Sequence, residues 1–192
     1  MPEVILASTS SYRRALLERL HVPFCTVAPK VREDSRAGEL PADRAARLSL
    51  EKAQAVAQSH PDAVVIGSDQ VAADDQRVLH KPLDAARCRE QLRSVSGARV
   101  RFHTGCAVLA GRGAIRLMHL DTTTVVFRRL ETQEIERYVE VERPFDCAGG
   151  FQAEGLGIAL FERIESIDPT ALIGLPLIWL AEALRRAGCR VP

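Results

Sequence analysis

Two carboxylates, Asp69 and Glu33, are the side chains of this sequence best suited to hold a metal or activate water. Asp69 directly follows the apolar run Ala63–Gly67, which we predict to be a buried strand ending there. Ligands of open α/β sheets bind at the carboxyl ends of strands, where a carboxylate can hold a metal or activate water. Glu33 lies in a charged segment and could supply a second carboxylate. The alternatives are an aspartate that caps a turn and a solvated glutamate.

Lys52 stands in the apolar stripe of a predicted helix. Ala45, Leu48 and Val56 recur at the spacing of one helix face, and Lys52 falls in the middle of that stripe. An inward lysine is costly unless an anion meets it, so Lys52 is a candidate for binding phosphate. The alternative is a lysine whose stem packs on the apolar face while its ammonium reaches water. The sequence leaves both interpretations open.

The segment after the first predicted strand has the composition of an anion site. Ser8 opens a polar turn of four residues, and a helix that carries Arg13 follows it. Backbone N–H groups at a helix start bind anions, and a guanidinium adds donors. The alternative is an ordinary serine N-cap with solvated arginines. The pattern G-x-x-x-x-G-K-[ST] is absent from the sequence, which excludes a P-loop.

Two further candidates lie in predicted loops. Lys81 precedes Pro82, whose fixed φ could hold the lysine toward phosphate. Glu154 follows two glycines, which let a backbone approach a ligand closely, and its carboxylate could accept from the edge of a base. Taken alone, Lys81 is better explained as a surface lysine, and Glu154 could equally face water. Together with the other charged residues, however, they form a set suited to phosphate and a divalent metal.

Strand-like and helix-like stretches alternate along the chain, with a β-rich middle. The predicted helices are Tyr12–Leu20, Pro41–Ser59, Asp84–Val95, Glu131–Val141 and Pro176–Arg186. The predicted strands are Val4–Ala7, Ala63–Gly67, Arg99–His103, Cys106–Ala110, Ile115–Leu120, Thr122–Arg129 and Ile158–Ile164. A hairpin turn is expected at Gly111–Gly113, and loops at 28–40 and 145–157. This order predicts an α/β fold with a mixed sheet and flanking helices, in one domain spanning residues 1–192.

Composition excludes several classes of protein. Among 192 residues, 26 Lys and Arg balance 25 Asp and Glu, which argues against a general nucleic-acid binder. No stretch is apolar enough to span a membrane, so we expect no membrane partner. The five cysteines show neither metal-ligand spacing nor a pairing pattern, so we expect reduced thiols, a cytoplasmic location, and no catalytic role for Cys147.

Beyond these single residues, the ordered motifs of the chain resemble the Maf nucleotide pyrophosphatases over almost the whole length. The matching segments are Ile5–Leu17, Glu51–Ala53, Ile66–Val71, Lys81–Pro82, Ser96–Gly97, Thr104–Gly105, Asp146–Phe151 and Gly174–Leu177. So many ordered matches are far more specific than any one motif. Ser68-Asp69-Gln70 and Ala153–Gly157 resemble the branch of the family described as acting on 7-methyl-GTP.

The resemblance implies a fold and an activity. The fold is α/β with a deep cleft between two lobes, and dimerisation is implied by the family. The activity is hydrolysis of a nucleoside triphosphate between its α and β phosphates, which gives a monophosphate and pyrophosphate, with a divalent cation such as Mg or Mn.

The resemblance also implies roles for individual residues. Asp69 matches the proton acceptor and would share the cation with Glu33. Arg13, Glu33, Lys52 and Lys81 match other positions of the cleft. In the mechanism that we expect, the three cations neutralise phosphate charge, and Ser8 and the start of the first helix cradle phosphate oxygens. The positions that set substrate specificity match Tyr12, Gln70 and Glu154.

At four positions the sequence departs from the usual family pattern. Ser11 replaces a proline at the helix start, and Arg32 replaces a frequent aspartate beside Glu33. His80 replaces the glycine before Lys81, and Gln152 replaces a lysine of this branch.

Two rival functions stay open. One is a Maf branch that acts on dTTP and UTP. The other is a non-catalytic nucleotide-binding regulator of cell division, against which the presence of the proposed acid and cations speaks.

Overall fold

The computed structural model describes residues 2–75 and 77–192 of the chain. Its α-helices are α1 (Ser11–Glu18), α2 (Pro41–Ala57), α3 (Ala85–Val95), α4 (Thr132–Glu142) and α5 (Leu177–Arg186). Its strands are β1 (Val4–Ala7), β2 (Cys25–Thr26), β3 (Val64–Ala73), β4 (Val78–Leu79), β5 (Arg99–Ala110), β6 (Ile115–Phe127) and β7 (Phe161–Glu165). Short 3₁₀ helices are η1 (Gly111–Gly113), η2 (Ala148–Gly150), η3 (Leu156–Leu160) and η4 (Ala171–Ile173).

The strands form one mixed sheet of seven strands in the order β2-β1-β3-β5-β6-β7, with β4 paired to β3. β1 runs parallel to both β2 and β3, and its last residue, Ala7, lies opposite Gly67. β3 and β4 are antiparallel, as are β6 and β7. The predicted α/β fold with a mixed sheet is thus confirmed.

The chain divides into two compact units. Unit 1 contains residues 1–70, 103–121 and 168–192, and unit 2 contains residues 71–102 and 122–167. The division falls within β3, β5 and β6, so these strands contribute to both units.

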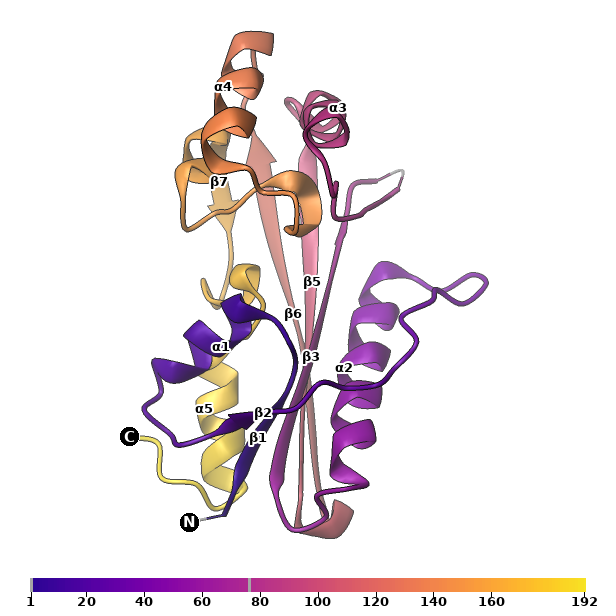
Figure 1. Ribbon diagram of the computed structural model, residues 1–192, viewed down its shortest axis with the longest axis vertical. Coiled ribbons are helices and arrows are strands. Elements are labelled where there is room, and N and C mark those ends of the chain that lie inside the picture. The colour runs from indigo at the N-terminus through magenta and orange to yellow at the C-terminus, as the bar shows by residue number, and fades with distance from the viewer. Residues whose placement is uncertain (1, 76) are drawn as a thin grey trace. The chain divides into compact units, whose positions relative to one another are not determined.

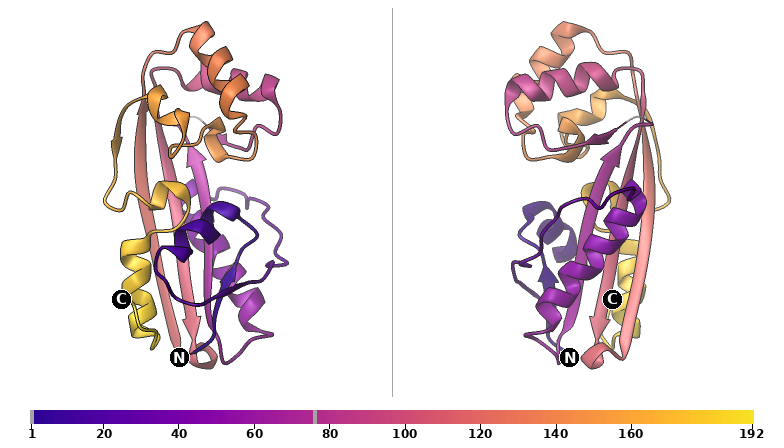
Figure 2. Two further views of the ribbon diagram at one scale, coloured as in Figure 1. Left: turned by 60° about the vertical axis from the view of Figure 1, so that its left-hand side comes forward. Right: turned by 90° about the vertical axis from the view of Figure 1, so that its right-hand side faces the viewer.

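In unit 1, helices cover both faces of the strands. Alternation along β1 sends Val4 and Leu6 to a core built with α1 and α5, and Ile5 and Ala7 to a core built with α2. Figures 1 and 2 show α2 on one face of these strands and α1 and α5 on the other. Strands buried on both faces read as continuous apolar runs, which explains why β1 has no polar residue.

In unit 2, a cluster of four phenylalanines forms the centre of the core. The ring of Phe151 makes edge-to-face contacts with Phe102, Phe127 and Phe161, at centroid distances of 4.8–5.4 Å. α3 and α4 pack against each other on one side of the strands of this unit (Figure 2).

Several predicted boundaries were wrong. The strand predicted to end at Gly67 continues through Asp69 to Ala73. Arg99–His103 and Cys106–Ala110 are one strand, and so are Ile115–Leu120 and Thr122–Arg129. The last predicted strand begins at Phe161, because residues 156–160 form η3 instead. Polar residues such as Asp69, Thr104 and Asp121 lie inside buried strands, where a hydrophobic pattern predicts a break.

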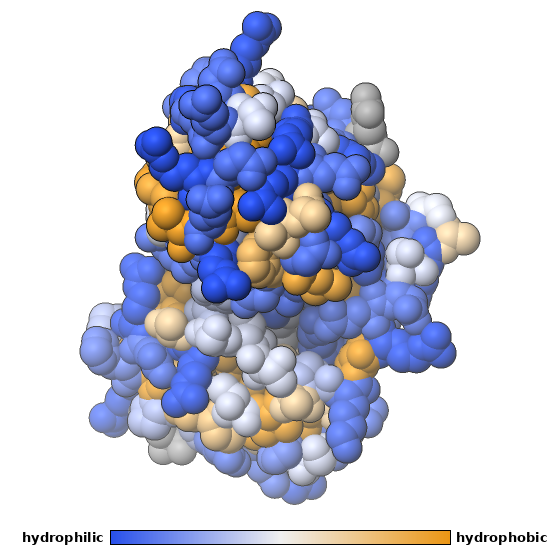
Figure 3. Space-filling view, turned by 45° about the horizontal axis from the view of Figure 1, so that its top comes forward, coloured by the Kyte–Doolittle hydropathy of each residue, from blue (hydrophilic) through white to orange (hydrophobic). Residues whose placement is uncertain are grey.

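No helix of the described residues is long and apolar enough to cross a membrane. The face shown in Figure 3 is mostly hydrophilic, and hydrophobic residues appear on it in separate patches.

Candidate functional site

Asp69 lies inside β3 at the point where its parallel neighbour has ended. β1 pairs with β3 only as far as Gly67, so Asp69 stands two residues beyond the last paired position. The sequence predicted a carboxylate just after a strand; the structure places it just after the parallel pairing instead. The side chain of Asp69 is buried, with 6% of the residue exposed. A buried carboxylate needs a partner of opposite charge.

Helix α2 supplies that partner because it packs unusually close to the sheet. A Cβ added to Gly67 would lie 2.2 Å from the backbone oxygen of Ser49, and one added to Gly105 would lie 2.3 Å from that of Ala45. Only glycine permits such an approach. The next turn of α2 carries Lys52, which the close packing brings within reach of β3.

The ammonium of Lys52 joins two carboxylates. Its Nζ lies 2.6 Å from Oδ1 of Asp69 and 2.7 Å from Oε1 of Glu33. Lys52 is itself buried, at 5% exposure, which confirms the inward orientation and excludes the snorkelling alternative. Three residues predicted from separate segments of the sequence thus meet at one nitrogen atom.

The loop that carries Glu33 is fastened to α2 by arginines. Arg44 donates from Nη2 to the backbone carbonyl of Glu33 at 2.7 Å, and Arg47 donates to that of Asp34 at 3.1 Å. Arg47 also pairs with Glu39, and this pairing lowers the pKa of the Glu39 carboxyl to about 2. The Glu33 side chain remains 58% exposed, so it is accessible to a ligand.

Arg13, on α1, adds a second cation to the same region. Burial lowers the pKa of its guanidinium, while the charges of Asp69 and Glu33 act in the opposite direction. An arginine keeps its charge under either influence. Its Nε donates to the backbone carbonyl of Gly174 at 3.1 Å, which holds the guanidinium in place.

The polar turn before α1 is a capped helix start. Ser10, not Ser8, is the N-cap: its side chain accepts from the backbone N–H of Arg13 at 3.4 Å. Ser8 is buried, and its Oγ accepts from the N–H of Ser10 at 3.1 Å. Tyr12 is half-buried in the first turn of α1. The serine N-cap that the sequence offered as the alternative is therefore present, at Ser10.

Gln70 and Ser68 face the opposite side of β3 from Asp69. The amide nitrogen of Gln70 donates to Oγ1 of Thr104 and to the backbone carbonyls of Ala171 and Leu172, at 2.9–3.0 Å. Ser68 donates to the carbonyl of Gly174 at 2.8 Å. The amide nitrogen of Gln70, proposed to contact substrate, thus also holds a backbone turn of unit 1.

Two predicted residues belong to unit 2. Lys81 follows β4 and is exposed, and Glu154 lies between η2 and η3 and is exposed as well. Among the departures from the family pattern, His80 is exposed and accepts through its backbone carbonyl from Gln91, while the backbone N–H of Gln152 donates to the hydroxyl of Tyr138. Arg32, in unit 1, pairs with Asp34 at 2.9 Å.

The oxygens of Asp69 and Glu33 are the ligands that hard divalent cations prefer. Both lie within 2.7 Å of one nitrogen, so they already share one cation, the ammonium of Lys52. Among the described residues, no group of three or more His, Cys, Asp and Glu side chains could hold a metal. Two carboxylates match the usual protein contribution to a magnesium site, in which substrate phosphates and water complete the coordination.

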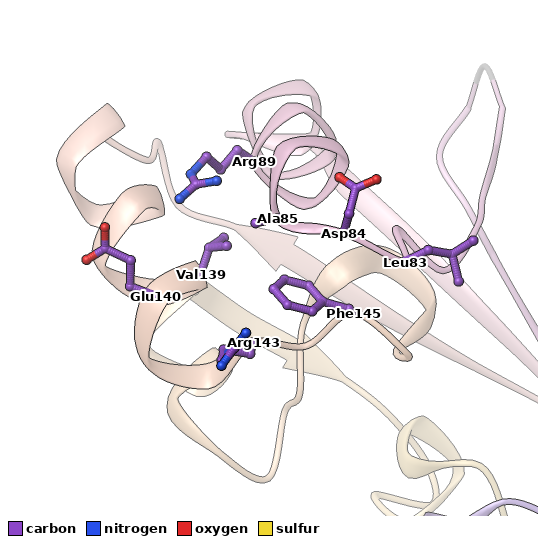
Figure 4. Close-up of a pocket in the computed structure, with 8 residues that line it drawn as sticks. All are labelled: Leu83, Asp84, Ala85, Arg89, Val139, Glu140, Arg143 and Phe145. Carbon is purple, nitrogen blue, oxygen red and sulfur yellow. The ribbon is translucent and has the colours of Figure 1, made fainter.

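A cavity of about 500 Å³ lies elsewhere, within unit 2. Figure 4 shows it between α3, which contributes Ala85 and Arg89, and α4, which contributes Val139 and Glu140. Phe145 also lines it, and its backbone carbonyl accepts from the N–H of Leu83 at 2.9 Å. The guanidinium of Arg143 lies 5.9 Å from the centre of the Phe145 ring. None of the residues predicted to bind substrate lines this cavity.

Sequence reasoning missed the polar groups that hold the site residues in place. Ser68 and Gly174 fell within the matched motifs but received no role, although the Gly174 carbonyl anchors Arg13. Thr104, Asp168 and Thr170 are buried polar residues within apolar surroundings. An isolated polar residue within an apolar run could have marked such a group as functionally important. Its hydrogen-bond partner, however, is distant in the sequence, so the pattern does not identify it.

Known proteins similar to this chain match it from end to end. One similar protein is a 7-methyl-GTP pyrophosphatase of Xanthomonas axonopodis pv. citri, which is 54% identical over 193 residues that cover 100% of both chains. Another of the same name, from Cupriavidus pinatubonensis, is 49% identical over 98% of this chain and 94% of its own.

Among solved structures, a HAM1 protein from Coxiella burnetii aligns with 68% of this chain and 75% of its own, at 14% identity and a TM-score of 0.46. The family model described as Maf-like protein matches residues 3–187, which include every residue of the candidate site. With that match and relatives about half identical along their whole length, the chain belongs to the Maf family.

Proposed function

We propose that this protein is a nucleoside triphosphate pyrophosphatase that acts on 7-methyl-GTP and releases 7-methyl-GMP and pyrophosphate. The observation that carries the proposal is the meeting of Lys52, Asp69 and Glu33 in unit 1. Family membership and the name shared by the most similar relatives give the reaction and the substrate.

In the proposed reaction, water attacks the α-phosphorus and the bond from that phosphorus to the bridging oxygen breaks. The carboxylate of Asp69 orients the water and accepts its proton. The bridging oxygen takes the bonding electrons and leaves with pyrophosphate. A buried carboxylate has little competing water, so its contact with the attacking water is strong.

Cations of the site neutralise the charge that develops on phosphate oxygens. Lys52 and Arg13 supply this charge within unit 1, and Lys81 is proposed to add a third cation from unit 2. Ser8, close to the start of α1, is proposed to contact phosphate oxygens. Lys52 has a second task, because its ammonium keeps the two carboxylates together.

A divalent cation, Mg or Mn, would be held by Glu33 and Asp69. When bound, it would supply Lewis-acid polarisation of the phosphoryl oxygens. The donor set fits this cation, since both ligands are carboxylates and one of them is exposed enough to accept an incoming ion. Ser68 and Gln70, on the other face of β3, are not part of this donor set.

For the base, we propose recognition by Glu154, Tyr12 and Gln70. Methylation of guanine at its seventh position gives the ring a positive charge. A carboxylate such as Glu154 favours a cationic ring and can accept from its N–H groups. An aromatic face such as that of Tyr12 attracts a cation by about 0.5–2 kcal/mol. The bases of dTTP and UTP, the alternative substrates, carry neither this positive charge nor the amide and amino N–H groups that Glu154 would bind.

The cytoplasm is the proposed location. All five cysteines are free thiols, and Cys25 is exposed, which suits a reducing compartment that also supplies nucleotides. Homodimerisation is a proposal that rests on the family alone. The chain is proposed to act as a single functional domain, with neither nucleic acid nor membrane as a partner.

The test is a product assay over a panel of substrates. Purified protein with Mg²⁺ or Mn²⁺ is incubated with 7-methyl-GTP, GTP, dTTP and UTP, and pyrophosphate and the nucleotide product are measured separately. The proposal expects pyrophosphate and monophosphate in equal amounts, with 7-methyl-GTP as the best substrate. A preference for dTTP or UTP would favour the alternative branch. Tight nucleotide binding without any product would favour the non-catalytic regulator.

A further inference from the structure

The segment from Asp168 to Ile178 of unit 1 is closed on itself by buried side chains. Asp168 is 3% exposed, and its Oδ1 accepts from the N–H and the hydroxyl of Thr170 at 2.9 and 2.6 Å. Its Oδ2 accepts from the N–H of Ile178 at 2.7 Å. The hydroxyl oxygen of Thr170 accepts from the N–H of Leu177 at 2.9 Å. The first N–H groups of a helix have no acceptor within the helix. At the start of α5, those of Leu177 and Ile178 are instead bonded to side chains seven and ten positions upstream.

This closed segment presents three backbone carbonyls to residues of the candidate site. The carbonyls of Ala171 and Leu172 accept from Gln70. The carbonyl of Gly174 accepts from Arg13. The Gly174 backbone has a φ of +127°, and an added Cβ would lie 3.3 Å from Nε of Arg13. The direction of the carbonyl therefore depends on a glycine conformation that the rest of the segment must maintain.

We propose that Asp168 is a positioning residue for Arg13. Asp168 is buried, and both of its carboxylate oxygens accept hydrogen bonds from within the segment, so the role proposed for it is to position another residue. Its carboxylate fixes the fold of the 168–178 segment, the segment fixes the Gly174 carbonyl, and this carbonyl orients the guanidinium that neutralises phosphate. The proposal rests on the proposed function for its effect on turnover, whereas the orientation of Arg13 can be measured without any substrate.

The variants are Asp168→Asn and Thr170→Val. In Asp168→Asn, the oxygen can still accept from Thr170, but the amide nitrogen is a donor and cannot accept from the N–H of Ile178. Thr170→Val keeps the shape and removes the acceptor of the Leu177 N–H, so it serves if Asp168→Asn folds poorly. The control is Glu131→Ala, which removes the N-cap of α4 in unit 2.

The first readout is water exchange of the Arg13 Nε–H, followed as its cross-peak in a proton–nitrogen correlation spectrum. Loss of the peak in Arg13→Lys assigns it. We expect the Arg13 Nε–H to exchange roughly 10-fold faster or more in Asp168→Asn and Thr170→Val. In these variants the Gly174 carbonyl is held less firmly, so it protects this hydrogen less from exchange. Glu131→Ala should leave it unchanged. Unchanged exchange in both test variants would overturn the proposal.

The second readout is kcat and KM for pyrophosphate release from 7-methyl-GTP. A misplaced guanidinium should lower kcat by roughly 10- to 100-fold. In an Arg13→Lys background the same Asp168→Asn change should cost little, because the group it positions is gone. An equal loss in both backgrounds would contradict the proposal. If the unmodified protein hydrolyses no triphosphate, the proposed function fails, and the exchange measurement still decides the role of Asp168.

Discussion

The ammonium of Lys52 and the carboxylate of Asp69 form a buried ion pair, with Nζ 2.6 Å from Oδ1, between a helix and a strand that the chain separates by 17 positions. Glu33 shares the same ammonium. Buried ion pairs are costly to break, because removing one partner leaves the other charge without compensation. This pair therefore links the stability of unit 1 to the chemistry proposed for it.

Replacing Lys52 by Met should destabilise the protein, because Asp69 would stay buried without its partner. We expect a loss of about 3 kcal/mol in the free energy of unfolding. The double variant Lys52→Met with Asp69→Asn should recover much of this loss. Urea unfolding of the two single variants, the double variant and the parent measures the coupling. Strictly additive effects would show that the pair contributes nothing.

The two glycines under α2 should be intolerant of any side chain. Gly67→Ala or Gly105→Ala places a Cβ against the helix backbone, so α2 must move away from the sheet. We expect at least about 1–3 kcal/mol of destabilisation and a loss of turnover, because Lys52 moves with the helix. Gly38→Ala is the control for backbone strain alone: its added Cβ meets no atom within 4 Å but its φ is +73°, so it should lose some stability and keep its turnover. Near-parental stability of both test variants would refute the close-packing argument.

The sequence predicted the element types well because their causes are local. Apolar residues recurring every 3.6 positions around Lys52 predicted α2 and the inward orientation of the lysine. Short apolar runs predicted β1 and the first half of β3. The extent of the strands was wrong where buried polar residues such as Asp69 and Thr104 interrupt the apolar pattern.

The contacts within the site were less predictable, because they depend on partners far apart in the chain. Arg13 meets a carbonyl at Gly174, 161 positions away, and no local pattern reports such a contact. The choice of Ser10 as N-cap depends on where the helix begins, and sequence patterns fix such boundaries poorly. Residue roles taken from the family resemblance stay predictions.

The buried thiols should make the protein less stable at alkaline pH. Burial raises the pKa of Cys88 to about 11 and that of Cys106 to about 12. Thiols of the unfolded chain titrate near about 8.5, so above that pH the unfolded state releases protons that the folded state keeps. The contribution of the two buried thiols to the free energy of unfolding is thus fully present below a pH of about 8.5. It is lost progressively as the pH rises toward about 12.

Urea unfolding at a series of pH values checks this expectation. The double variant Cys88→Ala with Cys106→Ala should show a shallower fall in stability between pH of about 8.5 and 11 than the parent. Comparing slopes removes the constant cost of the smaller side chains. Parallel curves for the two proteins would mean that these thiols do not control the alkaline response.

Substrate preference should depend on the charge of Glu154. Glu154→Gln keeps the size of the side chain but removes the charge that favours a methylated, cationic base. We expect the advantage of 7-methyl-GTP over GTP in kcat/KM to shrink by roughly 10-fold, with little change for UTP. Glu162→Gln, an exposed glutamate of β7, is the control. An unchanged ranking of the four triphosphates would remove Glu154 from base recognition.

Hydrolysis of 7-methyl-GTP by the parent protein and by Asp69→Asn, with both products quantified, tests the central claim most directly. The parent should release one 7-methyl-GMP for each pyrophosphate. Asp69→Asn should fold and bind nucleotide but turn over roughly 10²- to 10⁴-fold more slowly, because it cannot accept the proton of water. Release of a diphosphate with inorganic phosphate by the parent, or parental turnover by Asp69→Asn, would contradict the account.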